Sequence, residues 1–273
     1  MVRTMTKMYE SSIPNELIPL MDDFARLLRS RIPHLAHGLY LQGSIALGGY
    51  RSMKSDIDFI AVLNQAYLCE EDIASIHAVH EELRGKHPYH LAAEGLYTSL
   101  AHLNKTARVA GESFPKLFHG GTRALQSGYI DATSAWILKH HGVTVLGPEP
   151  SALGITVEWD EILSQMDYNL NVYWADKAER LELFMDEEWI EFAVLTLARI
   201  MYTLEHREFL TKLEAGYQML ERQPVRWQCV LREAIRIREG AEGASFTTEL
   251  ERAQEVQQFV QRVIGDCNAA YRF

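Results

Sequence analysis

Two acidic residues, Asp56 and Asp58, stand two positions apart at the start of an apolar, β-branched stretch at residues 57–63. Residues two apart on a strand point to the same face, so both carboxylates are expected on one side while Ile57 points to the core. Two close carboxylates repel each other unless a cation neutralises them. Mg²⁺ suits such a pair, because it binds one or two carboxylates together with substrate phosphates. The pair therefore predicts a magnesium site.

A glycine–serine pair, Gly43 and Ser44, follows a short apolar segment at 38–42 that reads as a strand. A helix is expected to begin within 45–50, so the pair would form the turn at its start. Such a turn presents backbone N–H groups that suit a phosphate, and glycine allows the close approach. The Ser44 hydroxyl adds a further donor. The pair predicts a phosphate-binding turn.

A third carboxylate, Glu94, lies within residues 91–100, which read as another strand. A neighbouring strand lies about 4.8 Å away, so Glu94 could reach the same pocket. Each motif alone is weak, because a D-x-D sequence is more often a solvated strand edge. The whole series of strand, turn, D-x-D and strand glutamate indicates nucleotide transfer much more specifically.

The elements that position these residues divide the chain in two. Asp131 is expected to cap a helix that Gly142 ends, and the segment 104–130 is Gly-rich and ambiguous. From about residue 157 onward almost every segment has helical periodicity. The predicted fold is α+β, with a domain built on a small mixed sheet at 1–156 and an α-helical bundle domain at 157–273. The further predicted helices cover 15–31, 71–84 and 131–141, and a last strand covers 143–146.

The composition narrows the classes of protein that the chain can represent. Of its 273 residues 47% are hydrophobic, which excludes a disordered chain, and the net charge of −10 argues against a nucleic-acid partner. The cysteines Cys69, Cys229 and Cys267 are odd in number and far apart, so neither a disulfide framework nor a zinc site is expected. Residues 1–12 lack the apolar run of a signal peptide. We expect a cytoplasmic monomer without a membrane partner.

The motifs together resemble those of the polymerase-β-like nucleotidyltransferases. The closer similarity is to the aminoglycoside adenylyltransferases that modify streptomycin and spectinomycin. In that family a nucleotidyltransferase domain precedes a helical domain, and ATP and drug bind between them. The resemblance is looser at 211–212 and in the last helices. It is carried by Gly43-Ser44, by Ser55 to Asp58, by Ala93-Glu94, and by residues 145–148 and 194–200.

The resemblance implies a catalytic centre of three carboxylates. Asp56 and Asp58 would hold Mg²⁺, with two ions expected, and Glu94 would complete the metal centre. Glu94 would also be the general base that takes the proton from the drug hydroxyl. The hydroxyl would attack the α-phosphorus in line while pyrophosphate leaves, a reaction in which metal ions neutralise the charge that shifts to oxygen.

The resemblance also implies the residues that contact ATP as the co-substrate. Ser44 and Ser55 would contact its phosphates, with Gly43 in the turn. Arg199 and Lys212 of the helical domain would reach the triphosphate. On the bare sequence Arg199 could equally be a helix-packing residue with a buried stem, and Lys212 a solvated side chain.

The substrate would be a cationic antibiotic. Trp174 stands where streptomycin-modifying relatives carry a tryptophan, and Asp176 or Glu179 would be the acidic partner. An aromatic face and a carboxylate suit a guanidinium or ammonium group, although Trp174 could instead be a core residue. Arg238 stands where relatives place a tyrosine against the nucleotide, which leaves the adenine contact open.

The predicted function is transfer of AMP from Mg·ATP to a hydroxyl of an aminoglycoside or aminocyclitol such as streptomycin or spectinomycin. Pyrophosphate would be released, and the modification would confer resistance. One alternative is a nucleotidyltransferase that acts on a protein or another metabolite. A second is a nucleotide-binding regulator without turnover, although the presence of all three carboxylates argues against it.

Overall fold

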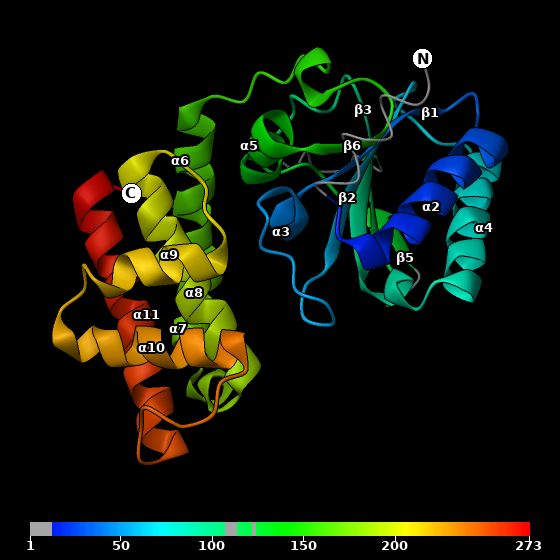
Figure 1. Ribbon diagram of the computed structural model, residues 1–273. Helices are drawn as coiled ribbons and strands as arrows, with labels where there is room; N and C mark the ends of the chain where they lie inside the picture. Colours follow the sequence, from blue (N-terminus) through cyan, green and yellow to red (C-terminus); the bar gives the residue numbers. More distant parts are fainter. Residues whose placement is uncertain (1–12, 107–113, 122–123) are drawn as a thin grey trace. The chain divides into compact units, whose positions relative to one another are not determined.

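The computed structural model describes residues 13–106, 114–121 and 124–273. The chain divides into two compact units, Met1–Glu158 and Trp159–Phe273 (Figure 1). The roles expected for domains 1–156 and 157–273 stay predictions. The expectation for residues 1–12, and part of the ambiguous segment 104–130, lie outside the described residues. No described helix combines the length and the apolar character that crossing a membrane requires.

The first unit is built on a six-stranded mixed sheet with the order β5-β4-β3-β2-β1-β6. Strands β2 and β3 pair in parallel, and the other neighbouring strands pair antiparallel. The strands are β1 (Ala36–Leu41), β2 (Ile57–Leu63), β3 (Ala93–Ser99), β4 (Lys116–His119), β5 (Ala124–Ser127) and β6 (Val143–Leu146).

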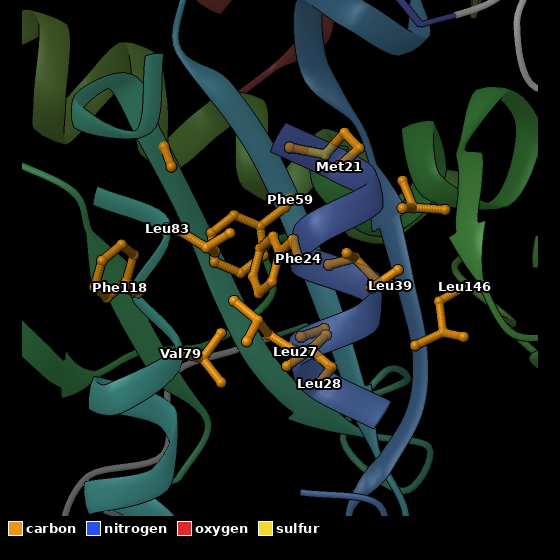
Figure 2. Packing of buried hydrophobic residues seen from close by; sticks show 14 of the residues in the cluster. Met21, Phe24, Leu27, Leu28, Leu39, Phe59, Val79, Leu83, Phe118 and Leu146 are labelled. Atoms are coloured by element: carbon orange, nitrogen blue, oxygen red, sulfur yellow. The ribbon is translucent and has the colours of Figure 1, made fainter. Parts of the chain in front are cut away.

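Two helices, α2 (Ile18–Arg31) and α4 (Glu70–Lys86), lie side by side over one face of this sheet (Figure 1). Figure 2 shows side chains of both helices meeting those of the strands in one core. The remaining helices of this unit are α3 (Gly43–Ala46), α5 (Ala132–His141) and the short turns η1 (Asn15–Leu17), η2 (Pro88–Ala92) and η3 (Pro150–Ala152).

Alternate strand residues supply the core under α2 and α4. Phe59 of β2 packs edge-on against Phe24 of α2, with ring centroids 5.1 Å apart (Figure 2). Ile57 belongs to the same cluster, as does Tyr97 of β3. Because successive strand residues point to opposite faces, the even-numbered residues of β2 and β3 face away from these helices. This alternation decides which face of the sheet carries the candidate site.

The second unit consists of helices, with α8 (Glu187–His206) packed against α9, α10 and α11. The stripe predicted along α8, from Ile190 to Leu204, is buried. The mixed sheet of the first unit and the helices of the second together confirm the predicted α+β class. The other elements are α6 (Trp159–Tyr168), the π-helix η4 (Asn169–Trp174), α7 (Ala175–Ala178), η5 (Leu181–Met185), α9 (Lys212–Leu220), α10 (Val225–Glu239) and α11 (Glu249–Tyr271).

The elements around the phosphate turn differ in part from the prediction. The expectation of a helix beginning within 45–50 was wrong, because α3 begins at Gly43 and ends at Ala46. Gly48 follows with a φ of +75°, a left-handed conformation that ends helices. The predicted start and stop of α5 are confirmed: the Asp131 side chain accepts a hydrogen bond from the Ser134 N–H at 2.9 Å, and Gly142 follows the last turn.

A buried polar chain lies within the core beneath β3. The Tyr97 hydroxyl and the His80 Nε2 are 2.9 Å apart, and the His80 Nδ1 and the His90 Nε2 are also 2.9 Å apart. The His80 ring stacks on Phe118 with centroids 3.4 Å apart. Burial lowers the pKa of His80 well below its usual range. Burial, with a smaller contribution from Arg84, lowers the pKa of His90 to about 4.

We expect this chain to make the first unit acid-sensitive. A histidine that stays neutral when folded but titrates near pH 6.5 when unfolded stabilises the fold fully above that pH and progressively less toward pH 4. For His90 the loss is about 2 kcal/mol at pH 5. Urea unfolding between pH 7.5 and 5 measures it. His90→Gln should weaken this pH dependence, whereas His37→Gln, a change of a half-buried residue outside this chain of side chains, should retain it. An unchanged dependence of the unfolding free energy on pH in His90→Gln would contradict the prediction.

Candidate functional site

The turn after β1 is held directly against β2. Gly43 has a φ of +57°, which lies in the left-handed region that favours glycine. The Gln42 N–H donates to the Asp58 carbonyl oxygen at 2.9 Å. A Cβ on Gly43 would overlap the carboxylate of Asp58. The backbone angle and the close approach therefore both require glycine here.

The two serines predicted to contact phosphate have different surroundings. The Ser44 hydroxyl oxygen is buried and has no hydrogen-bond partner among the described residues. The Ser55 hydroxyl accepts from the Arg51 N–H at 3.0 Å, and the Ser55 N–H donates to the Arg51 carbonyl oxygen at 2.9 Å. Ser55 thus closes the loop that leads to Asp56. Because a buried hydroxyl without a partner is unusual, Ser44 is the stronger candidate for a ligand contact.

The carboxylates lie on neighbouring strands at one edge of the sheet. Asp58 is the register partner of Glu94 in the parallel pair of β2 and β3. Both are half-buried and face away from the α2/α4 core, whereas Ile57 between the two aspartates is fully buried, as predicted. Asp56 precedes β2 and is exposed. The parallel pairing therefore brings Glu94 beside the aspartate pair.

The electrostatic setting of Glu94 suits a proton acceptor. Burial raises the pKa of its carboxyl group, and the nearby Asp56 raises it further, while His119 acts in the opposite direction. The Glu94 carboxylate forms no hydrogen bond to the described part of the chain. A carboxylate with a raised pKa and free oxygens can accept a proton from a hydroxyl more readily than a solvated one can.

His119 is a candidate that the sequence reasoning missed. It is the register partner of Glu94 in the antiparallel pair of β3 and β4, so its side chain lies on the site face. Strand β4 has only four residues and lies in a Gly-rich segment, so the alternating pattern of a strand is hard to recognise in the sequence. The available signal was a short apolar run bounded by Pro115 and by the glycines at 120–121.

The donor set fits a magnesium ion held by two carboxylates. Within residues 13–106, 114–121 and 124–273, no three His, Cys, Asp or Glu side chains are arranged to hold one metal ion. Glu94 lies on the neighbouring strand, in register with Asp58, and its role as a third metal ligand stays a prediction. Asp56 and Asp58 suffice for Mg²⁺, which completes its shell with phosphates and water. The cradle left by the missing Cβ of Gly43 lies beside this pair.

The predicted cations of the second unit lie on α8 and α9. Lys212 is the first residue of α9, and its ammonium group lies over the Phe192 ring, 4.7 Å from the centroid. Arg199 is half-buried on α8. Both side chains have interactions within the chain. Their contact with a triphosphate stays a prediction.

The predicted drug-binding residues surround the end of the π-helix η4. Trp174 is 1% exposed, and its ring packs against Phe192 with centroids 5.2 Å apart. Its indole face is thus part of the helical core, which was the alternative considered from the sequence. Asp176 is exposed and pairs with Lys177 at 2.5 Å, which lowers the pKa of its carboxyl group. Glu179 is exposed at the end of α7. The carboxylates are therefore accessible while the ring is not.

Arg238, which replaces the tyrosine of relatives, is buried at the end of α10. Its guanidinium donates to Glu191 of α8 at 2.8 Å. One turn earlier, the fully buried Glu233 accepts from Arg236 and Arg252, and the pKa of its carboxyl group is about 2. Burial opposes this shift and the charged hydrogen bonds outweigh it. These ion pairs hold α8, α10 and α11 together.

Comparison with known proteins gives a family for the second unit and a fold for the chain. Residues 173–265 match the family described as aminoglycoside adenylyltransferase, C-terminal domain. The matched segment lies within the second unit, which is therefore similar to the C-terminal domain of that family. No curated protein matches it.

Among solved structures, the spectinomycin adenyltransferase AAD(9) from Enterococcus faecialis, crystallised with ATP and spectinomycin, is similar. The two share 15% sequence identity and a TM-score of 0.64, over 90% of this chain and 98% of that one. At this identity the likeness establishes the fold. The predicted resemblance to the aminoglycoside adenylyltransferases is confirmed over residues 173–265.

Replacing Gly43 by alanine should destabilise the protein more than the same change at Gly48. Both residues have positive φ angles, and alanine in that region costs about 1–2 kcal/mol. At Gly43 the new Cβ also overlaps Asp58, whereas at Gly48 it meets nothing within 4 Å. Urea unfolding measures the loss of unfolding free energy in each variant, and the difference between the two losses gives the cost of the overlap at Gly43. Equal losses of unfolding free energy would contradict the tight contact.

Proposed function

We propose that the chain transfers AMP from Mg·ATP to a hydroxyl group of a cationic aminoglycoside or aminocyclitol. The observation that carries this proposal is the contact of the Gly43 turn with the Asp58 carboxylate, with Glu94 in register beside it. The turn that would bind phosphate, the carboxylate that would hold the metal and the residue that would accept the proton therefore lie on or beside two neighbouring strands. Nucleotidyl transfer needs these three groups together.

Asp56 and Asp58 would hold the magnesium. When bound, the ion neutralises charge on the phosphate oxygens of the nucleotide. The Ser44 hydroxyl, which has no partner in the described chain, would donate to a phosphate oxygen. Backbone N–H groups at the start of α3 would add further donors, because the first N–H groups of a helix lack intrahelical partners. Ser55 would act chiefly by shaping the loop before Asp56.

Glu94 would accept the proton of the acceptor hydroxyl. As that proton leaves, the hydroxyl oxygen forms a bond to the α-phosphorus, and the bond from the α-phosphorus to the pyrophosphate oxygen breaks. The raised pKa of Glu94 supports this role, because a more basic carboxylate takes the proton more readily. Arg199 and Lys212 would neutralise the triphosphate charge from the second unit.

The acceptor would be a polycation. AAD(9) was crystallised with spectinomycin, and the net charge of −10 favours a cationic substrate over a phosphate-rich one. Asp176 and Glu179 are exposed carboxylates near Trp174 that could pair with an ammonium or guanidinium group. Trp174 would support this surface by packing, because its ring is buried.

A panel of acceptors tests the substrate class. Mixed with ATP and Mg²⁺, the protein should release pyrophosphate when spectinomycin or streptomycin is added. It should release no pyrophosphate without a drug. Asp58→Asn should abolish the release, because it removes a charge that neutralises the metal. Release that depends only on a protein or another metabolite would replace the proposed acceptor. ATP binding without transfer to any acceptor would favour a nucleotide-binding regulator.

Replacing Glu94 by glutamine should lower kcat by about 10²- to 10⁴-fold, the usual contribution of a general base. ATP affinity should change little, because the side chain keeps its shape and lies beside the phosphate turn rather than in it. Single-turnover kinetics and calorimetry separate the two effects. Glu70→Gln, a change of an exposed residue on α4, serves as the control. Undiminished turnover in Glu94→Gln would exclude Glu94 as the base.

A further inference from the structure

Three polar side chains form a row across the site face of the sheet. Asp58 of β2 is in register with Glu94 of β3, and Glu94 is in register with His119 of β4. Directly opposed residues of antiparallel strands have Cβ atoms about 4.5–5.5 Å apart. The proposed function uses the first two members of this row and leaves His119 without a role.

The backbone of His119 is fixed relative to Glu94. The Gly120 N–H donates to the carbonyl oxygen of Ala93, the residue before Glu94, at 2.7 Å. The Arg84 guanidinium donates to the Gly120 carbonyl oxygen from α4. A Cβ on Gly120 would overlap backbone oxygens, so this turn is tightly packed. The imidazole therefore projects from a rigid segment beside the proposed base.

The ring of His119 has a defined hydrogen-bonding state. The Gly121 N–H donates to its Nδ1 at 3.2 Å, so this nitrogen is an acceptor and does not carry a proton. In the neutral ring the proton is then on Nε2, because neutral imidazole has one donor and one acceptor nitrogen. His119 can thus present an N–H donor to the site face, where its side chain is exposed.

The Glu94 carboxylate lacks an orienting partner. It forms no hydrogen bond to the described residues, and the acidic Asp56 acts on it unfavourably. A general base must lie within hydrogen-bond reach of the proton that it accepts. The neutral His119 ring offers an N–H donor in register beside it, on the same face of the sheet. A hydrogen bond from His119 would restrict the carboxylate rotamers and leave one oxygen for the substrate.

We propose that His119 is a positioning residue for the reaction: its Nε2–H donates to one oxygen of Glu94 and aims the other at the acceptor hydroxyl. This inference rests on the proposed function of Glu94 as the base. His119 touches neither nucleotide nor metal in this arrangement. Its loss should therefore affect the chemical step and leave ATP binding intact.

Kinetics of three variants test the positioning role. His119→Ala should lower kcat by about 10- to 100-fold, because a misplaced group costs up to about 10² in rate. The KM for ATP should stay within about twofold. His119→Gln should recover most of kcat, because its amide N–H lies near the position of Nε2. His119→Asn should not recover it, because its amide reaches only the position of Nδ1.

A matched control is His37→Gln, at the far end of β1 from the site. It should leave kcat and KM unchanged. A rate in His119→Ala equal to that of the wild type would overturn the proposal. So would equal losses in His119→Ala and His119→Gln, or a loss expressed only in the KM for ATP.

Nitrogen NMR of the histidine-labelled protein gives a readout that does not require activity. The His119 ring should have its proton on Nε2, and Glu94→Gln should shift the Nε2 resonance while leaving that of His37 in place. An Nε2 resonance of His119 that stays in place in Glu94→Gln would contradict the positioning role. If the wild-type protein transfers AMP to no acceptor, the proposed function fails, and the NMR result still decides whether His119 contacts Glu94.

Discussion

The site depends on the contact between the backbone of Gly43 and the carboxylate of Asp58. No other residue type tolerates both the left-handed φ and the space that the carboxylate occupies. The hydrogen bond from Gln42 to the Asp58 carbonyl then ties the turn to the strand. With the turn held against Asp58 in this way, the register of β2, β3 and β4 alone places Glu94 and His119 in line with that carboxylate.

The core beneath the sheet holds this arrangement in place. Alternation along β2 and β3 assigns one set of side chains to the core of α2 and α4 and the other to the site face. A slip of one residue would exchange the two sets, so the burial of Phe59 and Tyr97 also protects the register of the carboxylates. The buried His80 and His90 belong to this support, and burial lowers the pKa of both rings.

Local patterns predicted much of the fold, and long-range pairing explains most of what they missed. The strand at 57–63 and the caps of α5 follow from apolar periodicity and from Asp131 and Gly142. The helix that begins at Gly43 was predicted to begin later in the sequence. The φ angle of a glycine depends on its three-dimensional surroundings, which the sequence does not show. His119 escaped notice because its partner, Glu94, is joined to it by strand pairing, which sequence spacing does not encode. The burial of Trp174 likewise depends on packing against Phe192.

The row of register partners has a consequence for how the sequence of such a sheet can change over time. Main-chain hydrogen bonds set the spacing between neighbouring strands at about 4.8 Å, whatever side chains lie between the functional positions. Substitutions elsewhere on the strands can therefore accumulate without altering the distances among the reacting groups. This chain and AAD(9) share a fold at 15% identity, so a backbone arrangement of this kind persists while most of the side chains differ.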